Sequence, residues 1–407
     1  MVEFTVLNCD VLVGLKSLPS DSVDCVVTSP PYWGLRDYKV DGQIGLEEHP
    51  QQYVDKIVEI GKEVMRVLKP TGSYWLNIGD SYYSKSGSGK GSNFMDTFKK
   101  LDGGDGVLAN MHTQVRGKFK DGGWLQPKQR LLIPHRVAIG MQDSGWILRN
   151  DIIWHKPSCM PSSVQDRLSN TFEYFFHFVK QPKYFYDLDS IRVPYKNNSI
   201  ERAKSPVNSY NWHNLSKVGI KDCETKTEKA EQNMATLNPL GKNPGDVWDV
   251  TNNGFKLGHF AVFPKELVRP CIKATCPKEI CNKCGKPRQR ISEYSGYIHC
   301  TGGSDRGKLA TNSGEIIKDL GSTKQMETRE KVFVGWSDCG CNAGFHSGIV
   351  LDIFLGSGTT MEVCQEEKRK AIGIELNEKY VDFVLHRLNG DKLQSSLNPN
   401  KIEVIKL

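Results

Sequence analysis

The chain has 407 residues, 38% of them hydrophobic, and Lys plus Arg exceed Asp plus Glu by 54 to 47, which gives a formal charge of +7. This composition is enough for one large domain with additions, or for two domains. It has no run long and apolar enough to cross a membrane, and its N-terminus lacks a secretion signal, so we expect a cytoplasmic protein without membrane contact. The modest positive charge is compatible with nucleic-acid binding but does not establish it.

The first elements predict a β-α-β unit. Residues 4–7 form a strand, residues 11–18 a short helix, and the β-branched run 22–27 a buried strand. Asp10 follows the first strand, where a carboxylate either caps the next helix or accepts hydrogen bonds from a ligand. Taken alone, this position favours the cap.

The loop after the second strand, Thr-Ser-Pro-Pro-Tyr-Trp at residues 28–33, is the most informative stretch of the chain. Two consecutive prolines have no N–H for a sheet, so the strand ends there, at the edge where open α/β sheets bind ligands. Ser29, the proline carbonyls and the Tyr32 ring make an acceptor-rich turn beside a stacking surface. Such a turn suits a planar amine, although a plain surface turn is the alternative.

The middle of the chain adds further elements around two polar stretches. Helices are predicted over 53–68 and 134–145, and strands over 73–78, 146–154 and 172–179, the last two close enough to pair antiparallel at a sheet edge. Residues 80–132 are rich in Gly, Ser, Lys and Asp and predict a flexible insertion. We interpret His155 and His177 as hydrogen-bonded residues at strand ends rather than as catalytic groups.

Residues 191–257 are polar, with isolated aromatic residues among Lys and Asn. This mixture suits contacts to bases and phosphates, and a decorated loop without a binding role is the alternative.

Twelve cysteines without a secretion signal suggest metal ligands or buried thiols before disulfides. Cys281-x-x-Cys284 and Cys339-x-Cys341 supply four thiolates, which suit a tetrahedral zinc ion of structural type. Competing ligands are Cys271, Cys276 and Cys300. The remaining candidates, Cys9, Cys25 and Cys364, fall within strand and helix patterns and are expected in the core.

A second motif lies near the end of the chain. The apolar run 348–355 leads into the glycine-rich turn 356–360, and a helix is expected from about Thr359. A strand over 371–375 then ends in Glu375, and residues 380–388 form a closing helix. A carboxylate one βα unit after a glycine loop is placed to accept from both ribose hydroxyls, so the pair indicates an adenosine-bearing ligand.

The Ser-Pro-Pro-Tyr loop followed by the Asp352-x-Phe354-x-Gly356-x-Gly358-Thr359-Thr360 motif resembles the β group of S-adenosylmethionine-dependent DNA amino-methyltransferases. The resemblance implies an α/β fold: a Rossmann-like doubly wound sheet with a circularly permuted motif order. It also implies four catalytic-loop residues, Ser29, Pro30, Pro31 and Tyr32. The implied cofactor-binding residues are Asp10, Phe263, Asp352, Phe354, Gly356, Gly358, Thr359, Thr360 and Glu375.

The implied reaction is transfer of a methyl group from S-adenosylmethionine to the exocyclic N4 amine of cytosine in double-stranded DNA, after base flipping. Ser at the first position of the loop favours cytosine N4, with adenine N6 as the alternative. A non-catalytic zinc-containing DNA-binding protein is a further alternative. A cognate restriction endonuclease is a possible partner.

These predictions divide the chain into three parts. Residues 1–190 form the catalytic-loop half of the core and contain the insertion 80–132. Residues 191–257 are the target-recognition insertion. Residues 258–407 form the cofactor-loop half, with a zinc insertion at about 271–345.

Overall fold

The computed structural model describes residues 3–83, 124–204 apart from 160, 161 and 163, 238, 240–251, 264–298, 328–389 and 402–407. By its internal contacts the chain divides into two units. The first contains residues 1–187, 245–288 and 339–407, and the second contains residues 188–244 and 289–338.

The first unit is built on a nine-stranded sheet with the strand order β13-β1-β12-β11-β2-β3-β5-β4-β6. The strands are β1 (Phe4–Asn8), β2 (Val23–Thr28), β3 (Leu68–Ile78), β4 (Ile147–His155), β5 (Phe172–Val179), β6 (Val247–Asp249), β11 (Ile349–Asp352), β12 (Lys370–Glu375) and β13 (Ile402–Lys406). Neighbouring strands run parallel from β13 to β3, whereas β5 is antiparallel to both β3 and β4. The antiparallel β4–β5 pair was expected at the sheet edge, but β6 extends the sheet beyond β4.

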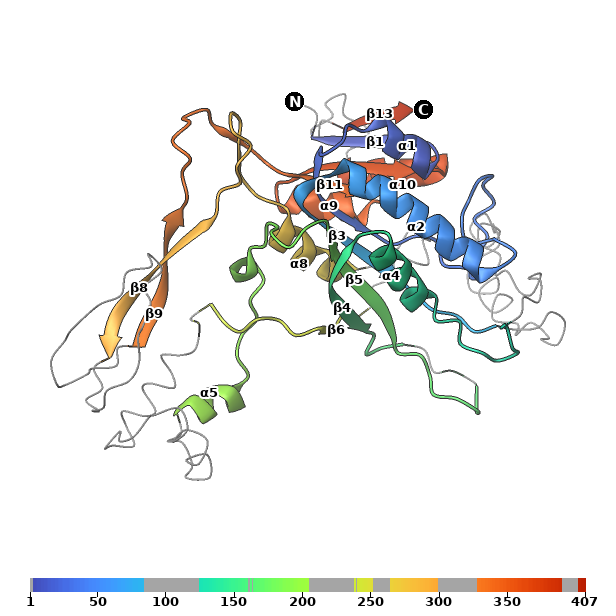
Figure 1. Cartoon of the computed structure of the whole chain (residues 1–407), viewed down its shortest axis with the longest axis horizontal. Helices are drawn as coiled ribbons and strands as arrows, with labels where there is room; N and C mark the ends of the chain where they lie inside the picture. The colour runs from blue at the N-terminus through green and yellow to red at the C-terminus, as the bar shows by residue number, and fades with distance from the viewer. Residues whose placement is uncertain are drawn as a thin grey trace. The chain divides into compact units, whose positions relative to one another are not determined.

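Helices cover both faces of this sheet, as expected for a doubly wound fold (Figure 1). One face carries α1 (Val11–Ser17), α2 (Pro50–Val67) and α4 (Ile133–Asp143), and the other carries α8 (Lys265–Thr275), α9 (Thr359–Glu366) and α10 (Glu378–Asn389). Each face has its own hydrophobic core, and β2 contributes to both because alternate side chains point to opposite faces. Val26 packs into the first core and Val27 into the second.

The late strand β11 lies at the centre of the sheet, between β12 and β2. Val350 on β11 pairs with Cys25 on β2, so the loops that follow these two strands emerge side by side. The permuted order of the motifs therefore still brings the Ser-Pro-Pro-Tyr loop and the glycine-rich loop to one edge of the sheet.

The expected insertions have other bounds in the structure. Cys271 lies within α8 and Cys276 caps its carboxyl end, and both are buried in the core, so the zinc insertion predicted from about 271 begins inside a core helix. A small antiparallel pair in the first unit joins β7 (Ile280–Cys281) to β10 (Phe345–His346). Of the expected insertion 191–257, residues 247–249 belong to the large sheet, and 205–237, 239 and 252–257 lie outside the described residues.

The second unit contains an antiparallel hairpin of β8 (Arg290–Ile298) and β9 (Thr328–Trp336). It also holds the short helices η1 (Leu188–Ser190) and α5 (Asn197–Lys204), and an isolated bridge between Val193 and Lys242. Among the helices of the described residues, none has both the length and the apolar character needed to cross a membrane.

Candidate functional site

A cavity of about 270 Å³ lies in the first unit, and its lining comes from the loops and strand ends at one edge of the large sheet. Asp10 follows β1, Ser29 follows β2, Phe354 follows β11, and Glu375 ends β12. This is the carboxyl edge of the parallel strands, where open α/β sheets bind their ligands.

The Ser-Pro-Pro-Tyr loop is held from behind by buried side chains. The Tyr53 hydroxyl on α2 donates to the Pro31 carbonyl at 2.8 Å. The Trp33 indole N–H donates to the Glu47 carbonyl at 3.0 Å, and its ring is buried, so Trp33 packs into the core rather than facing the cavity. The Tyr32 ring passes so close to Gly79 that a Cβ there would lie 2.5 Å from a ring carbon, which only glycine avoids.

Ser29 and Tyr32 share a hydrogen-bonded cluster with two residues of the neighbouring strands. The side-chain oxygen of Asn77, at the end of β3, accepts from the Ser29 hydroxyl at 3.2 Å and the Tyr32 hydroxyl at 3.0 Å. The same Tyr32 proton can instead go to Glu173 on β5, whose carboxylate oxygen lies 2.7 Å away, so Asn77 and Glu173 share this single donor. Glu173 forms an ion pair with Lys156, and all five side chains line the cavity.

Burial and the nearby Glu173 charge raise the pKa of Tyr32 well above its ordinary value. The phenol therefore stays protonated at neutral pH and acts as a donor to Glu173.

Asp352 connects the base of the Ser-Pro-Pro-Tyr loop to the helix that follows the glycine-rich turn. Its carboxylate accepts from the Thr28 hydroxyl at the end of β2 and from the Thr360 hydroxyl on α9, each at 2.6 Å. It also accepts from the Phe354 backbone N–H at 3.1 Å. Burial raises the pKa of Asp352 to about 6, and these hydrogen bonds oppose the rise.

Glu375 braces the glycine-rich turn from the cavity side. Its two carboxylate oxygens accept from the backbone N–H groups of Gly356, at 2.7 Å, and Asn377, at 2.8 Å. Burial raises its pKa to about 7. Gly356 and Gly358 have φ values of 53° and 82°, in the left-handed region that glycine enters at little cost.

The structure brings most of the predicted site residues to the cavity and places some of them behind it. The residues that line it are Ser29, Pro30, Pro31, Tyr32, Asp10, Phe354, Gly356, Thr359 and Glu375. Asp352, Gly358 and Thr360 are absent from the lining and form the support of the loop. Asp10 also caps α1 by accepting from the Leu12 N–H at 2.9 Å, so capping and cavity lining occur together. Phe263 lies outside the described residues.

Among the cavity side chains that the sequence motifs do not contain are Asn77, Trp154, Lys156 and Glu173. Glu173 begins β5, and because β5 is antiparallel to β3, its first residues reach the edge where the parallel strands end. A polar residue at the start of a predicted antiparallel strand is the signal that would have found it.

The histidines are structural, as expected. His177 is buried, stacks on Trp75 with ring centroids 3.9 Å apart, and pairs with the Ser73 hydroxyl at 3.0 Å. Burial lowers its pKa to about 3, so it stays neutral. His155 pairs with Asp249 at 2.7 Å, and neither histidine lines the cavity.

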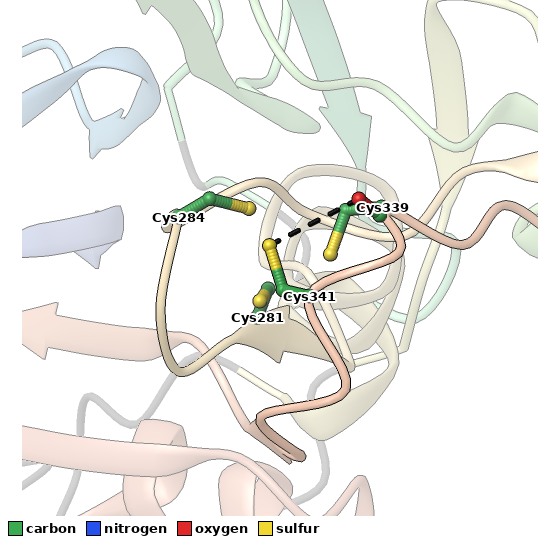
Figure 2. Close-up of side chains that lie close together, drawn as sticks. All are labelled: Cys281, Cys284, Cys339 and Cys341. Carbon is green, nitrogen blue, oxygen red and sulfur yellow. Dashed lines mark hydrogen bonds between the residues drawn. The ribbon is translucent and has the colours of Figure 1, made fainter.

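The cysteines of the two short motifs form a separate cluster. The sulfurs of Cys281, Cys284, Cys339 and Cys341 all lie within 4.8 Å of one another and point toward a common centre (Figure 2). Tetrahedral zinc with Zn–S bonds of about 2.3 Å needs sulfurs roughly 3.8 Å apart, so small side-chain shifts would complete the site. Backbone N–H groups of the knuckle lower the pKa of Cys281 to about 6, which favours a thiolate.

The other described cysteines that were considered as alternative ligands lie outside this cluster. Cys9, Cys25 and Cys364 are buried in the core, as expected. Cys271 and Cys276 are buried there too, and Cys300 lies outside the described residues.

Comparison with known proteins adds an independent observation. The family described as DNA methylase matches residues 23–282 and 342–386. The type II methyltransferase M.Cfr9I of Citrobacter freundii is 32% identical over 387 residues, covering 95% of this chain and 88% of the relative. M.SfiI of Streptomyces fimbriatus is 42% identical over 366 residues, covering 68% and 81%. The solved PvuII DNA methyltransferase, described as cytosine-N4-specific, has 18% identity and a TM-score of 0.43, covering 96% of each chain.

Proposed function

Since this chain belongs to the S-adenosylmethionine-dependent DNA methylase family, whose members methylate exocyclic amines of DNA bases, we propose that its target is the N4 amine of cytosine in double-stranded DNA. The observation that carries the proposal is the position of Ser29. It lines the same cavity as the glycine-rich turn that would hold the cofactor, and it is the first residue of the Ser-Pro-Pro-Tyr loop.

The acceptors of the loop suit this reaction. The lone pair of an exocyclic amine is delocalised into its ring, which makes the amine a poor nucleophile. Ser29 and the Pro30 carbonyl would hold its hydrogens out of the ring plane and stabilise the positive charge that develops on nitrogen. S-adenosylmethionine supplies an activated methyl group, and Phe354, Gly356 and Glu375 would bind it on the opposite side of the cavity.

The base has to leave the duplex to reach this cavity, at a cost of a few kcal/mol. The Tyr32 ring would then stack on the extruded base and offset part of that cost.

The direct test identifies the methylated nucleoside. Purified protein and S-adenosylmethionine are incubated with unmethylated duplex DNA, which is digested to nucleosides and analysed by mass spectrometry. We expect N4-methylcytidine as its deoxynucleoside, and none with the Ser29→Ala variant. N6-methyladenine instead would assign the alternative target, and no transfer to any DNA would favour a non-catalytic DNA-binding protein.

We further propose that the four-cysteine cluster binds one structural zinc ion. Four neighbouring thiols cannot all ionise without a cation, and hydrogen bonds that the Cys341 thiol donates to Cys339 and Cys284 accordingly raise the pKa of Cys341 to about 12. Zinc binding would release these protons and join the Cys281–Cys284 knuckle to the Cys339–Cys341 turn. With four protein ligands the ion has no open position for catalysis.

Metal analysis of the purified protein should find about one zinc per chain. A Cys281→Ser/Cys339→Ser double variant should lose the ion, and the small β7–β10 module should unfold, because structural zinc contributes ~10–16 kcal/mol to small modules. Cys159→Ser, which alters a partly exposed cysteine outside the cluster, is the matched control and should keep the zinc. Wild-type protein that is folded but free of zinc would exclude this proposal.

We also propose that this chain acts together with a restriction endonuclease, and the similarity to proteins named as type II methyltransferases supports this. Such an endonuclease would cut the same sequence only when it is unmethylated.

A further inference from the structure

The cluster around Ser29 holds more hydrogen-bond acceptors than protons. The Ser29 hydroxyl lies 3.4 Å from the Tyr32 hydroxyl oxygen, and the Tyr32 hydroxyl lies 2.7 Å from a carboxylate oxygen of Glu173. These contacts form a continuous chain from the first residue of the catalytic loop to a carboxylate on β5.

Asn77 lies beside this chain as a further acceptor for both hydroxyls. Its amide nitrogen donates to the Tyr174 carbonyl at 3.1 Å and to Glu173 at 3.3 Å. A flipped amide would set its oxygen against these two acceptors, so the oxygen must face Ser29 and Tyr32. Asn77 is buried and cannot take up a proton itself, so it orients the two hydroxyls without ending the chain at its own side chain.

Methylation of an amine creates a proton that the site must remove. When the new N–C bond forms, the nitrogen gains the positive charge and carries one hydrogen in excess. Neither the Ser29 hydroxyl nor a proline carbonyl can keep an additional proton at neutral pH. Of the described residues that line the cavity, three are carboxylates: Asp10, Glu173 and Glu375. Asp10 caps α1 and Glu375 braces the glycine turn, whereas Glu173 is hydrogen-bonded to the catalytic loop.

We propose that Glu173 is the proton acceptor of the reaction and receives the proton by relay through the hydroxyls of Ser29 and Tyr32. The amine proton passes to Ser29 Oγ, the Ser29 proton to Tyr32 Oη, and the Tyr32 proton to Glu173 Oε2. The transferred methyl leaves a neutral thioether, the amine ends as a neutral methylamine, and the carboxylate ends as a neutral acid. Glu173 then returns its proton to solvent.

The ion pair with Lys156 is compatible with this role. The methylated nitrogen is strongly acidic because its lone pair regains conjugation with the ring on losing the proton, so a carboxylate held in an ion pair can still accept that proton. Lys156 also lies 4.2 Å from the Trp154 ring centroid, which fixes the lysine beside Glu173.

The test uses single-turnover transfer of radiolabelled methyl groups, with the full-length protein and excess enzyme over duplex DNA. Glu173→Gln keeps the size of the side chain but removes the base, so the rate should fall ~10²-fold or more, the usual range for a lost proton acceptor. Tyr32→Phe keeps the stacking ring but breaks the relay, and it should lose a similar factor. The double variant should be no slower than either single variant, because each removes the same pathway.

Two further readouts separate proton transfer from a purely structural role. S-adenosylmethionine affinity by calorimetry, and capture of a fluorescent base analogue at the target position, should change less than about threefold in Glu173→Gln. In Glu173→Ala, added formate should bind beside Lys156 and restore part of the rate, whereas Tyr32→Phe should gain nothing from formate. Asp166→Asn removes a carboxylate from an exposed lysine pair away from the cavity and is the control at wild-type rate.

A wild-type rate in Glu173→Gln would overturn the proposal, and a wild-type rate in Tyr32→Phe would overturn the relay. Loss of rate together with weakened base capture and no rescue by formate would assign Glu173 a structural role and also overturn it. The proposal rests on the methyl-transfer function above, but the assay counts methyl groups on any base. An error in the target base would therefore leave this test intact.

Discussion

At the residue scale, hydrogen-bond partners separate the roles of two buried carboxylates that lie one βα unit apart. Asp352 accepts hydrogen bonds from the Thr28 and Thr360 hydroxyls and from a backbone N–H. These bonds connect β2 to α9. Glu375 lines the cavity and holds its hydrogen bonds through backbone N–H groups alone. Its pKa of about 7 places its ionisation in the neutral range.

We therefore predict that S-adenosylmethionine affinity depends on pH through Glu375. In the proposed role the ribose hydroxyls would donate to the ionised form, so binding below pH 7 would first have to release a proton. Affinity should rise with pH by up to about tenfold per unit as the pH approaches 7, and should level off above it. Calorimetry between pH 6 and 8, in two buffers of different ionisation enthalpy, measures both the affinity and the proton released.

Glu375→Gln is the control for this prediction and should bind weakly with no such pH dependence. The free energy of unfolding should depend on pH in the opposite direction to the cofactor affinity. The folded state keeps a proton that the unfolded chain releases above its ordinary pKa of 4.5, so the contribution of Glu375 falls as the pH rises from about 4.5 to about 7. A wild-type affinity that stays flat across this window would contradict the assignment of Glu375 to the ribose.

At the scale of elements, α2 acts as the rear support of the catalytic loop. It packs against the sheet through a buried stripe that includes Val54, Ile57, Ile60 and Val64. Tyr53 belongs to the same stripe and reaches the Pro31 carbonyl with its hydroxyl. One face of the helix thus contributes to the core and to the position of the loop.

Tyr53→Phe should uncouple these two contributions. The ring stays in the core, so the free energy of unfolding should fall by only roughly 0.5–1.5 kcal/mol, the net value of one hydrogen bond. Methyl transfer should fall further than stability suggests, because the loop loses a fixed point next to Pro30, while cofactor affinity stays unchanged. Tyr74→Phe, at a buried tyrosine packed against Trp146 and Phe178, is the matched control and should turn over normally. Equal rates for wild type and Tyr53→Phe would show that α2 does not tune the loop.

The sequence predicts those helices and strands whose local hydrophobic pattern is clear. The apolar strands around the two motifs and the amphipathic α2 have clear periodicity, and they were identified within a few residues. Three-residue β6 is too short to show a period, and α8 carries Pro270 within the helix, which argues against a helix on local grounds. Both are held by tertiary packing: Trp248 and Leu267 contact the same core beneath the sheet.

At the scale of the whole molecule, the two motifs predicted the fold because their order and spacing describe a known topology. Two polar residues of the cavity, Asn77 and Glu173, lie outside both motifs, and the motifs therefore did not predict them. Asn77 reaches the cavity from the carboxyl end of β3, whereas Glu173 reaches it because β5 runs antiparallel to β3, so that its first residues lie at the same edge of the sheet. The clustering of the four cysteines was predictable, because two closely spaced pairs of cysteines in tight turns are a local feature of the sequence.

The position of β1 has a consequence for synthesis on the ribosome. β1 lies between β12 and β13, with Phe4 opposite both Ala371 and Ile402, so the earliest strand of the described fold has the latest strands on both sides. A nascent chain must carry this strand with both hydrogen-bonding edges open until residues near 370 have emerged. The central strands β2 and β3 can pair long before, so the sheet should nucleate at its middle and recruit its amino-terminal segment last.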